Sequence, residues 1–139
     1  MTFPLNITIL YAGLLGLIAL ALAFNVSRAR AAANIPLGDG GNATLLRAIR
    51  MHASFCEFVP LCLILIGLIE MAHGPRWLVH TLGIVLVVAR ILHAQGIHSS
   101  GIGSSAGRAF GWKAGAGLTY LVLLVSAVVA TYYGVVWRT

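Results

Sequence analysis

Acidic residues are scarce in this chain of 139 residues. Asp39, Glu57 and Glu70 stand against nine lysines and arginines, and charged residues make up 9% of the sequence. With Asp39 as the only aspartate, no Ser-His-Asp catalytic set can be assembled. The HxxxH, HExxH and P-loop patterns are missing as well, and the glycine pattern that begins at Gly101 has no predicted strand before it. We therefore expect no metal site, and none of the activities that these motifs carry.

Basic clusters and cysteine motifs are also missing. The net charge of +6 comes from side chains scattered near the ends of apolar runs, so we expect no nucleic-acid partner. Cys56 and Cys62 lie on one helical segment, separated by about 9 Å of helix rise and about 120° of rotation. Because they cannot easily pair and lack a CxxC spacing, we interpret both as small buried apolar residues.

Apolar residues dominate the sequence instead. They make up 60% of the chain, and the mean hydropathy is +0.96, which indicates an integral membrane protein. Apolar runs recur at the length of about 20 residues that a helix needs to cross a hydrocarbon core of about 30 Å. We predict a single all-α domain over residues 1–139, a four-helix transmembrane bundle with helices at about 5–27, 43–72, 76–95 and 108–136.

Glycine and proline mark the connections between these helices. Residues 34–42 read as a loop, residues 73–76 as a tight turn, and the Gly- and Ser-rich residues 96–107 as a flexible loop. Asn42 or Thr44 can cap the second helix, and Pro60 would kink that helix.

The distribution of basic residues predicts the orientation in the membrane. The first and third loops are flanked by Arg28, Arg30, Arg47, Arg50, Arg90, Arg108 and Lys113. Only Arg76 and Arg138 mark the other side. By the positive-inside rule, loops one and three are cytoplasmic and both termini are periplasmic.

The second predicted helix carries charges inside an apolar segment. On a helix, Arg47, Arg50, Ser54 and Glu57 share an arc of about 80°. We call these four residues the polar stripe. Ionisable groups at membrane depth cost at least about 2.5 kcal/mol each, so the stripe should face protein, water or a polar ligand. Glu57 marks either a functional site or a structural ion pair with Arg50 or Arg47.

Arg90 and Arg108 add two positive charges at the same membrane face. Each arginine alone could simply set topology, but together with the stripe they suit a small ligand with several anionic groups, and Glu57 suits an amine. Arg90 either reaches toward the interface or is buried against a partner. His93 lies one turn after Arg90, where it is either a packed helix-end residue or a hydrogen-bond or proton donor to a ligand.

Small residues on the fourth predicted helix favour close helix packing. Gly111 and Gly115 have the small-xxx-small spacing that lets helices approach. Since four helices cannot shield a polar stripe on all sides, we expect an oligomer with sites between neighbouring chains.

The second helix resembles the signature of the MAPEG family, the membrane-associated proteins in eicosanoid and glutathione metabolism. The similarity rests on Arg47, Arg50, Ser54, Glu57, Phe58 and Pro60, and it extends through Arg90, His93 and Arg108 over nearly all of the chain. It implies a homotrimer of four-helix bundles in a bacterial inner membrane, with glutathione as co-substrate bound between subunits near the cytosolic face. Ser54 replaces the usual Asn and Phe58 the common Tyr, which argues against prostaglandin or leukotriene chemistry.

The resemblance also implies roles for individual residues. Arg108 would stabilise the glutathione thiolate as the catalytic residue. The tripeptide would be bound by Arg47, Arg50, Ser54, Glu57, Arg90 and His93, with Arg28 or Arg30 as a further contact.

We therefore expect a glutathione transferase or peroxidase that acts on hydrophobic electrophiles or lipid hydroperoxides. One alternative is a small membrane transporter that uses Glu57, although small multidrug exporters carry their acid in the first helix and residues 5–26 have none. Another is a non-catalytic, lipid-binding membrane scaffold.

Overall fold

Four long helices make up the computed structural model of the chain. The structure describes residues 5–98 and 105–136, with side chains for residues 5–95 and 110–136. The helices, in chain order, are α1 (Asn6–Ala33), α2 (Ala43–Met71), α3 (Arg76–His98) and α4 (Ser105–Val136). All four include stretches that are long and apolar enough to cross a membrane.

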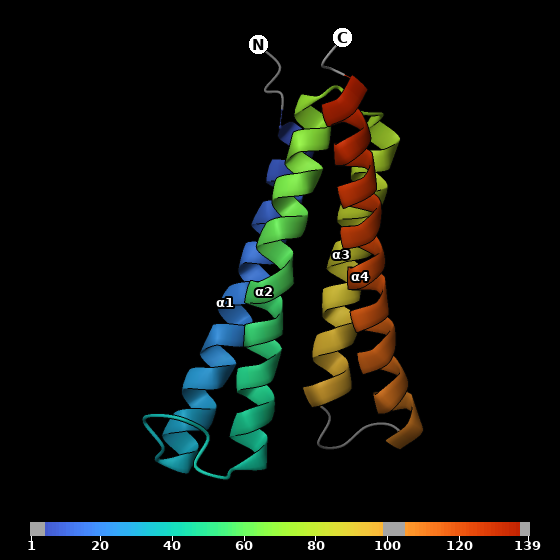
Figure 1. Cartoon of the computed structure of the whole chain (residues 1–139). Coiled ribbons are helices and arrows are strands. Elements are labelled where there is room, and N and C mark those ends of the chain that lie inside the picture. Colours follow the sequence, from blue (N-terminus) through green and yellow to red (C-terminus); the bar gives the residue numbers. More distant parts are fainter. Residues whose placement is uncertain (1–4, 99–104, 137–139) are drawn as a thin grey trace.

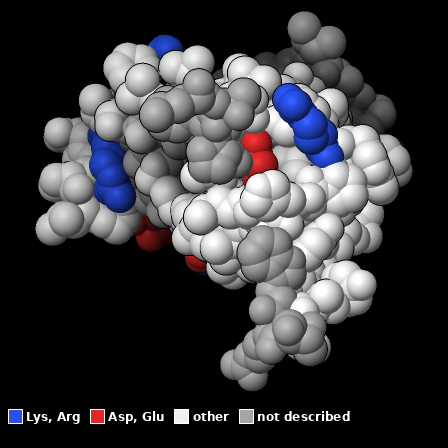
Figure 2. All heavy atoms as spheres, turned by 90° about the horizontal axis from the view of Figure 1, so that it is seen from above, with Lys and Arg blue, Asp and Glu red and all other residues white. Residues whose placement is uncertain are grey.

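The helices alternate in direction, so the bundle has two distinct ends (Figure 1). The N-terminal end of α1 and the C-terminal end of α4 lie at one end, which we call the terminal end. The connection between α1 and α2 lies at the other, together with the C-terminal end of α3 and the N-terminal end of α4, and we call this the loop end. Seen from the terminal end, the surface carries a few isolated charged side chains among mostly uncharged residues (Figure 2).

The helix bounds differ from the sequence-based prediction at two places. α1 continues past the expected end near residue 27 to Ala33, where Asn34 in the left-handed conformation (φ 54°) ends it. The loop predicted over 96–107 is too long, because α3 extends to His98 and α4 starts at Ser105; the rest of that loop, residues 99–104, lies outside the described residues. Helical hydrogen bonding at these polar ends continues further than their apolar patterns indicate.

The start of α2 is fixed by a side-chain cap. The Asn42 Oδ1 accepts hydrogen bonds from the backbone N–H groups of Thr44 and Leu45, both at 3.0 Å. Asn42, rather than Thr44, is therefore the capping residue, and it satisfies donors that have no partner within the helix. The helix then runs through Pro60 without a break in its assignment up to Met71.

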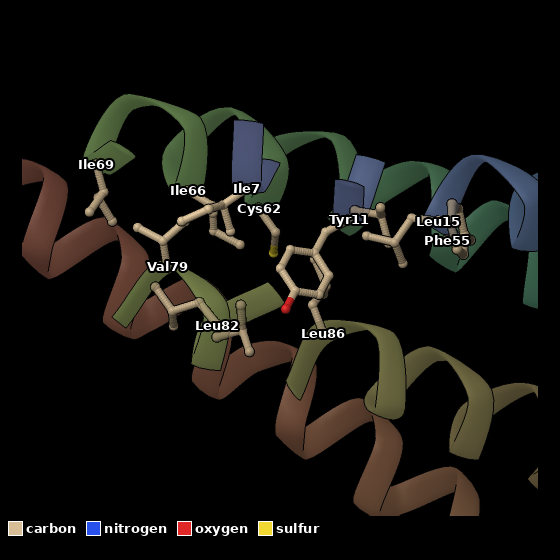
Figure 3. Close-up of a cluster of buried hydrophobic side chains, with 12 residues drawn as sticks. Ile7, Tyr11, Leu15, Phe55, Cys62, Ile66, Ile69, Val79, Leu82 and Leu86 are labelled. Carbon is tan, nitrogen blue, oxygen red and sulfur yellow. The ribbon is translucent and has the colours of Figure 1, made fainter. Parts of the chain in front are cut away.

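The core lies where α1, α2 and α3 meet. α1 contributes Ile7, Tyr11 and Leu15, and the facing residues include Cys62 and Ile66 of α2. The Tyr11 ring points from α1 toward Leu82 and Leu86 of α3 (Figure 3). Its hydroxyl is hydrogen-bonded to His80 Nδ1 at 3.0 Å, so the one polar atom of this ring has a partner inside the apolar core.

The N-terminus of α1 is held by a carboxylate from α2. Glu70 accepts hydrogen bonds from the backbone N–H groups of Ile7 (2.9 Å) and Thr8 (2.8 Å) and from the Thr8 hydroxyl (2.6 Å). An anion at a helix N-terminus is favoured by the helix dipole and by the unpaired N–H groups. Glu70 therefore has a structural role, which helix periodicity alone does not indicate because the contact joins two helices.

α3 and α4 pack closely near the loop end. At Gly115, an added Cβ would lie 2.6 Å from both the Ala89 carbonyl oxygen and the His93 backbone nitrogen. The predicted close approach at Gly115 is thus real, but it joins two helices of one chain. Because backbone atoms cannot yield as a side chain can, only glycine permits this separation.

We predict that Gly115→Ala destabilises the protein by about 1–3 kcal/mol, because α3 and α4 must separate. Gly117→Ala is the matched control: it adds the same methyl group to the same helix where nothing lies within 4 Å. That control should be neutral or slightly stabilising. The midpoints of unfolding of both variants in detergent test the prediction. Equal midpoints would show that the close approach of α3 and α4 at Gly115 does not contribute to stability.

Candidate functional site

The polar stripe lies on the side of α2 that faces away from α1. Gly67 and Glu70 mark the α1-facing side through their contacts with Thr8. Ser54, by contrast, contacts Arg90 of α3, and the Phe58 ring packs edge-on against Tyr120 of α4 at 5.3 Å. By helix geometry the stripe shares this second side.

Of the four stripe residues, only Ser54 packs against another helix of the bundle. It is half-buried, whereas Arg47, Arg50 and Glu57 are exposed on the outer surface of the chain. No ion pair joins Glu57 to Arg47 or Arg50 in the part of the chain with described side chains. Among the described side chains, these three charged groups of an apolar helix are therefore exposed and form no ion pair.

Arg90 is buried, at 3% relative exposure, near the loop end of α3. One terminal nitrogen of its guanidinium, Nη1, lies 3.4 Å from both the carbonyl oxygen and the hydroxyl of Ser54. The rings of Phe55 and Phe58 have their centres 6.0 Å from the guanidinium carbon, within cation–π range. Of the two possibilities for Arg90, burial against a partner is therefore the one observed.

These contacts leave Arg90 only partly satisfied. Its Nε is buried and has no hydrogen-bond partner in the described part of the chain. The two bonds to Ser54 are long, and neither acceptor carries a negative charge. A buried cation without a counter-charge is costly, so this guanidinium is suited to receive an anion.

His93 is packed rather than free. It is buried (7% exposed), and its Nδ1 lies 3.4 Å from the carbonyl oxygen of Trp112 on α4. Since a carbonyl only accepts hydrogen bonds, this contact places the ring proton on Nδ1 and leaves Nε2 as an acceptor in the neutral ring. Gly115 opposite allows the backbone at His93 to lie this close to α4.

The arginines of α1 do not join the stripe within one chain. Arg30 donates from Nη1 to the carbonyl oxygens of Ile35 and Pro36 (both 3.4 Å) and of Gly38 (2.8 Å), and so holds the loop after α1. Arg28 is exposed on the same helix. The backbone places Arg108 in the first turn of α4, but its side chain lies outside the described residues.

The two cysteines behave differently from each other. Cys62 is fully buried in the core, as expected, but the expectation for Cys56 is wrong, because it is exposed on α2. Its sulfur lies 3.7 Å from His52 Nε2, one helical turn earlier. By helix geometry Cys56 lies at least about 100° around α2 from every residue of the stripe.

Comparisons with known proteins agree with the fold of four membrane-spanning helices. The model of the MAPEG family matches residues 8–130, which include α2 and α3 and most of α1 and α4. The chain belongs to the MAPEG family. It is also similar to the inner membrane protein YecN of Escherichia coli K12, and to YecN of E. coli O6:H1, in each case 33% identical over 128 residues, which are 91% of this chain and 92% of the relative. This MAPEG chain is therefore a membrane protein with four helices able to span the bilayer.

We predict that Arg90→Met leaves the ligand-free protein as stable as the wild type, within about 1 kcal/mol, or makes it more stable. Replacing a buried charge by an apolar side chain of similar volume removes its desolvation cost. Thermal unfolding in detergent measures this, with Arg76→Met, an exposed arginine at the terminal end, as the control. A large loss of stability confined to Arg90→Met would instead assign Arg90 a structural role.

Proposed function

We propose that this MAPEG protein binds glutathione at the loop end and uses its thiolate to attack hydrophobic electrophiles or lipid hydroperoxides. The observation that carries the proposal is Arg90, a buried guanidinium with an unsatisfied Nε. It adjoins a helix whose stripe exposes two further arginines and an acid that form no ion pair with the described side chains. Such a cluster at membrane depth has a large free-energy cost unless a ligand or a second chain covers it.

The charges of glutathione complement this cluster. The tripeptide has two carboxylates, one amine and one thiol. Arg47 and Arg50 would hold a carboxylate through charge-assisted hydrogen bonds, and Glu57 would bind the amine. Arg90 with Ser54, and the Nε2 of His93, would contact the part of the ligand that reaches between α2 and α3.

Arg108 would act on the thiol. Its position in the first turn of α4 adds the positive end of the helix dipole to its own charge, and both lower the free energy of a thiolate relative to a thiol. With an electrophile, the thiolate sulfur forms the new carbon–sulfur bond as the leaving group departs with its electron pair. With a hydroperoxide, the sulfur attacks the terminal oxygen and is oxidised to a sulfenic acid while an alcohol leaves; a second glutathione then gives the disulfide and water.

The site is completed between chains in this proposal. Because the stripe is exposed on one chain, a homotrimer would place it against a neighbour, from which Arg28 or Arg30 would also come. The similarity to an inner membrane protein supports the bacterial inner membrane as the location. The excess of arginine at the loop end supports a cytoplasmic position for that end.

We predict saturable glutathione binding by the purified full chain, measured by isothermal titration calorimetry in detergent. Arg50→Ala should weaken binding about 10- to 100-fold, because a charge-assisted hydrogen bond is lost. Arg108→Ala should instead mainly reduce the ultraviolet absorbance of the bound thiolate and the rate of conjugation to an aryl halide. Arg76→Ala, at the opposite end, is the matched control and should bind as the wild type does.

The oligomeric state of every variant is checked by gel filtration with light scattering. If the wild-type oligomer is intact and binds no glutathione, the proposed function is wrong. Equal losses in Arg50→Ala and Arg76→Ala would mean that binding depends on overall charge and not on the stripe.

A further inference from the structure

A cleft opens between α1, α2 and α3 near the loop end, on a different side of α2 from the polar stripe. Its volume is about 340 Å³, and its walls include Ala21, Leu22, Phe24, Met51 and Ala94. In Figure 1 the α1–α2 pair and the α3–α4 pair diverge toward this end. The walls are mostly apolar, and the volume falls in the range of pockets that bind small ligands.

The polar residues of the cleft are a cation and two amides. Among the described side chains, Arg28 is the only charged residue of its lining, and Asn25 and Gln95 complete the polar part. Arg28 and Gln95 are exposed, while Asn25 is half-buried. Because no acid is among the described residues of the lining, none of them would pair with a positively charged group of a ligand.

A positively charged side chain, Arg90, lies behind the inner wall of the cleft. Leu22, Met51 and Ala94 also border a narrow gap, too small for a water molecule, whose lining includes Arg90 and His93. The buried, unpartnered Nε belongs to this same Arg90. Two arginines therefore contribute positive potential to the cleft, and the contribution of the buried Arg90 is weakly screened.

We propose that the cleft binds one acyl chain of an anionic phospholipid, with the lipid phosphate at Arg28. Arg28 lies five residues before Ala33, the last residue of α1, so its guanidinium is near the membrane boundary where lipid phosphates lie. The guanidinium fork suits the two phosphate oxygens, and the amides of Asn25 and Gln95 are donors for the same group. The acyl chain would lie against Leu22, Phe24 and Ala94.

The absence of an acid in the lining selects the headgroup. A zwitterionic phosphatidylethanolamine would bring an ammonium group that finds no counter-charge in the cleft, whereas phosphatidylglycerol brings a net negative charge and hydroxyls. The inference assigns Arg28 to lipid in its own chain and does not require glutathione. Of the two α1 arginines named for the proposed glutathione site, it leaves Arg30 for that site, so the lipid test and the glutathione test have separate outcomes.

Native mass spectrometry of the full chain in detergent tests the proposal directly. The protein is titrated with an equimolar mixture of phosphatidylglycerol and phosphatidylethanolamine that have the same acyl chains. The wild type should retain phosphatidylglycerol with at least about fivefold preference, the effect expected for one arginine at a lipid headgroup. Arg28→Gln should bring the preference close to one, and Arg28→Lys should keep most of it.

Two further variants separate the cleft from general surface attraction. Arg76→Gln removes an exposed arginine at the terminal end and should leave the preference unchanged. Ala94→Leu narrows the cleft without a change in charge and should reduce retention of both lipids. Wild-type protein without a preference, retention of detergent alone, equal effects of Arg28→Gln and Arg76→Gln, or unchanged retention in Ala94→Leu would each overturn the proposal.

Discussion

The need to pair charge inside an apolar layer governs this structure. An ionised group that leaves water must gain a partner, because hydrocarbon supplies none. Glu70 meets this condition within the chain, since three donors at the start of α1 surround its carboxylate. Arg90 does not meet this condition, because it has two long contacts to Ser54 and its Nε has no hydrogen-bond partner among the described residues. The difference separates a structural charge from one that is available to a ligand.

Close helix packing keeps Arg90 and His93 where they are. The contact of α4 with the backbone of α3 at Gly115 fixes the loop end of α3 beside α4. α2 then supplies Ser54, Phe55 and Phe58 around the guanidinium. The apolar rings exclude water from Arg90 without neutralising it, which strengthens any electrostatic interaction that it makes with an incoming anion.

Much of the fold could be predicted from the sequence, because long apolar runs and glycine-rich connections indicate helices and turns directly. The polar stripe was also predictable, since helix periodicity alone brings Arg47, Arg50, Ser54 and Glu57 to one side. Contacts between helices could not be predicted in this way. The pairing of Glu70 with the start of α1 and the exposure of Cys56 depend on how the helices rotate against each other.

The different environments of the two arginines of α1 could not be predicted from the sequence either. The sequence treats Arg28 and Arg30 alike, but the fold holds Arg30 on loop carbonyl oxygens and leaves Arg28 beside an apolar cleft. A cleft bordered by three helices has no signature in any one of them, because its walls are residues that also suit a lipid-facing surface. Only the packed structure distinguishes the two arginines.

A structure of the full chain in lipid nanodiscs with saturating glutathione would test most directly whether the polar stripe is a ligand site. We expect the tripeptide between two copies of the chain, with its carboxylates at Arg47 and Arg50 and with the Arg90 guanidinium turned toward it. A stripe that faces lipid or a dry protein interface, with no bound tripeptide, would contradict this interpretation.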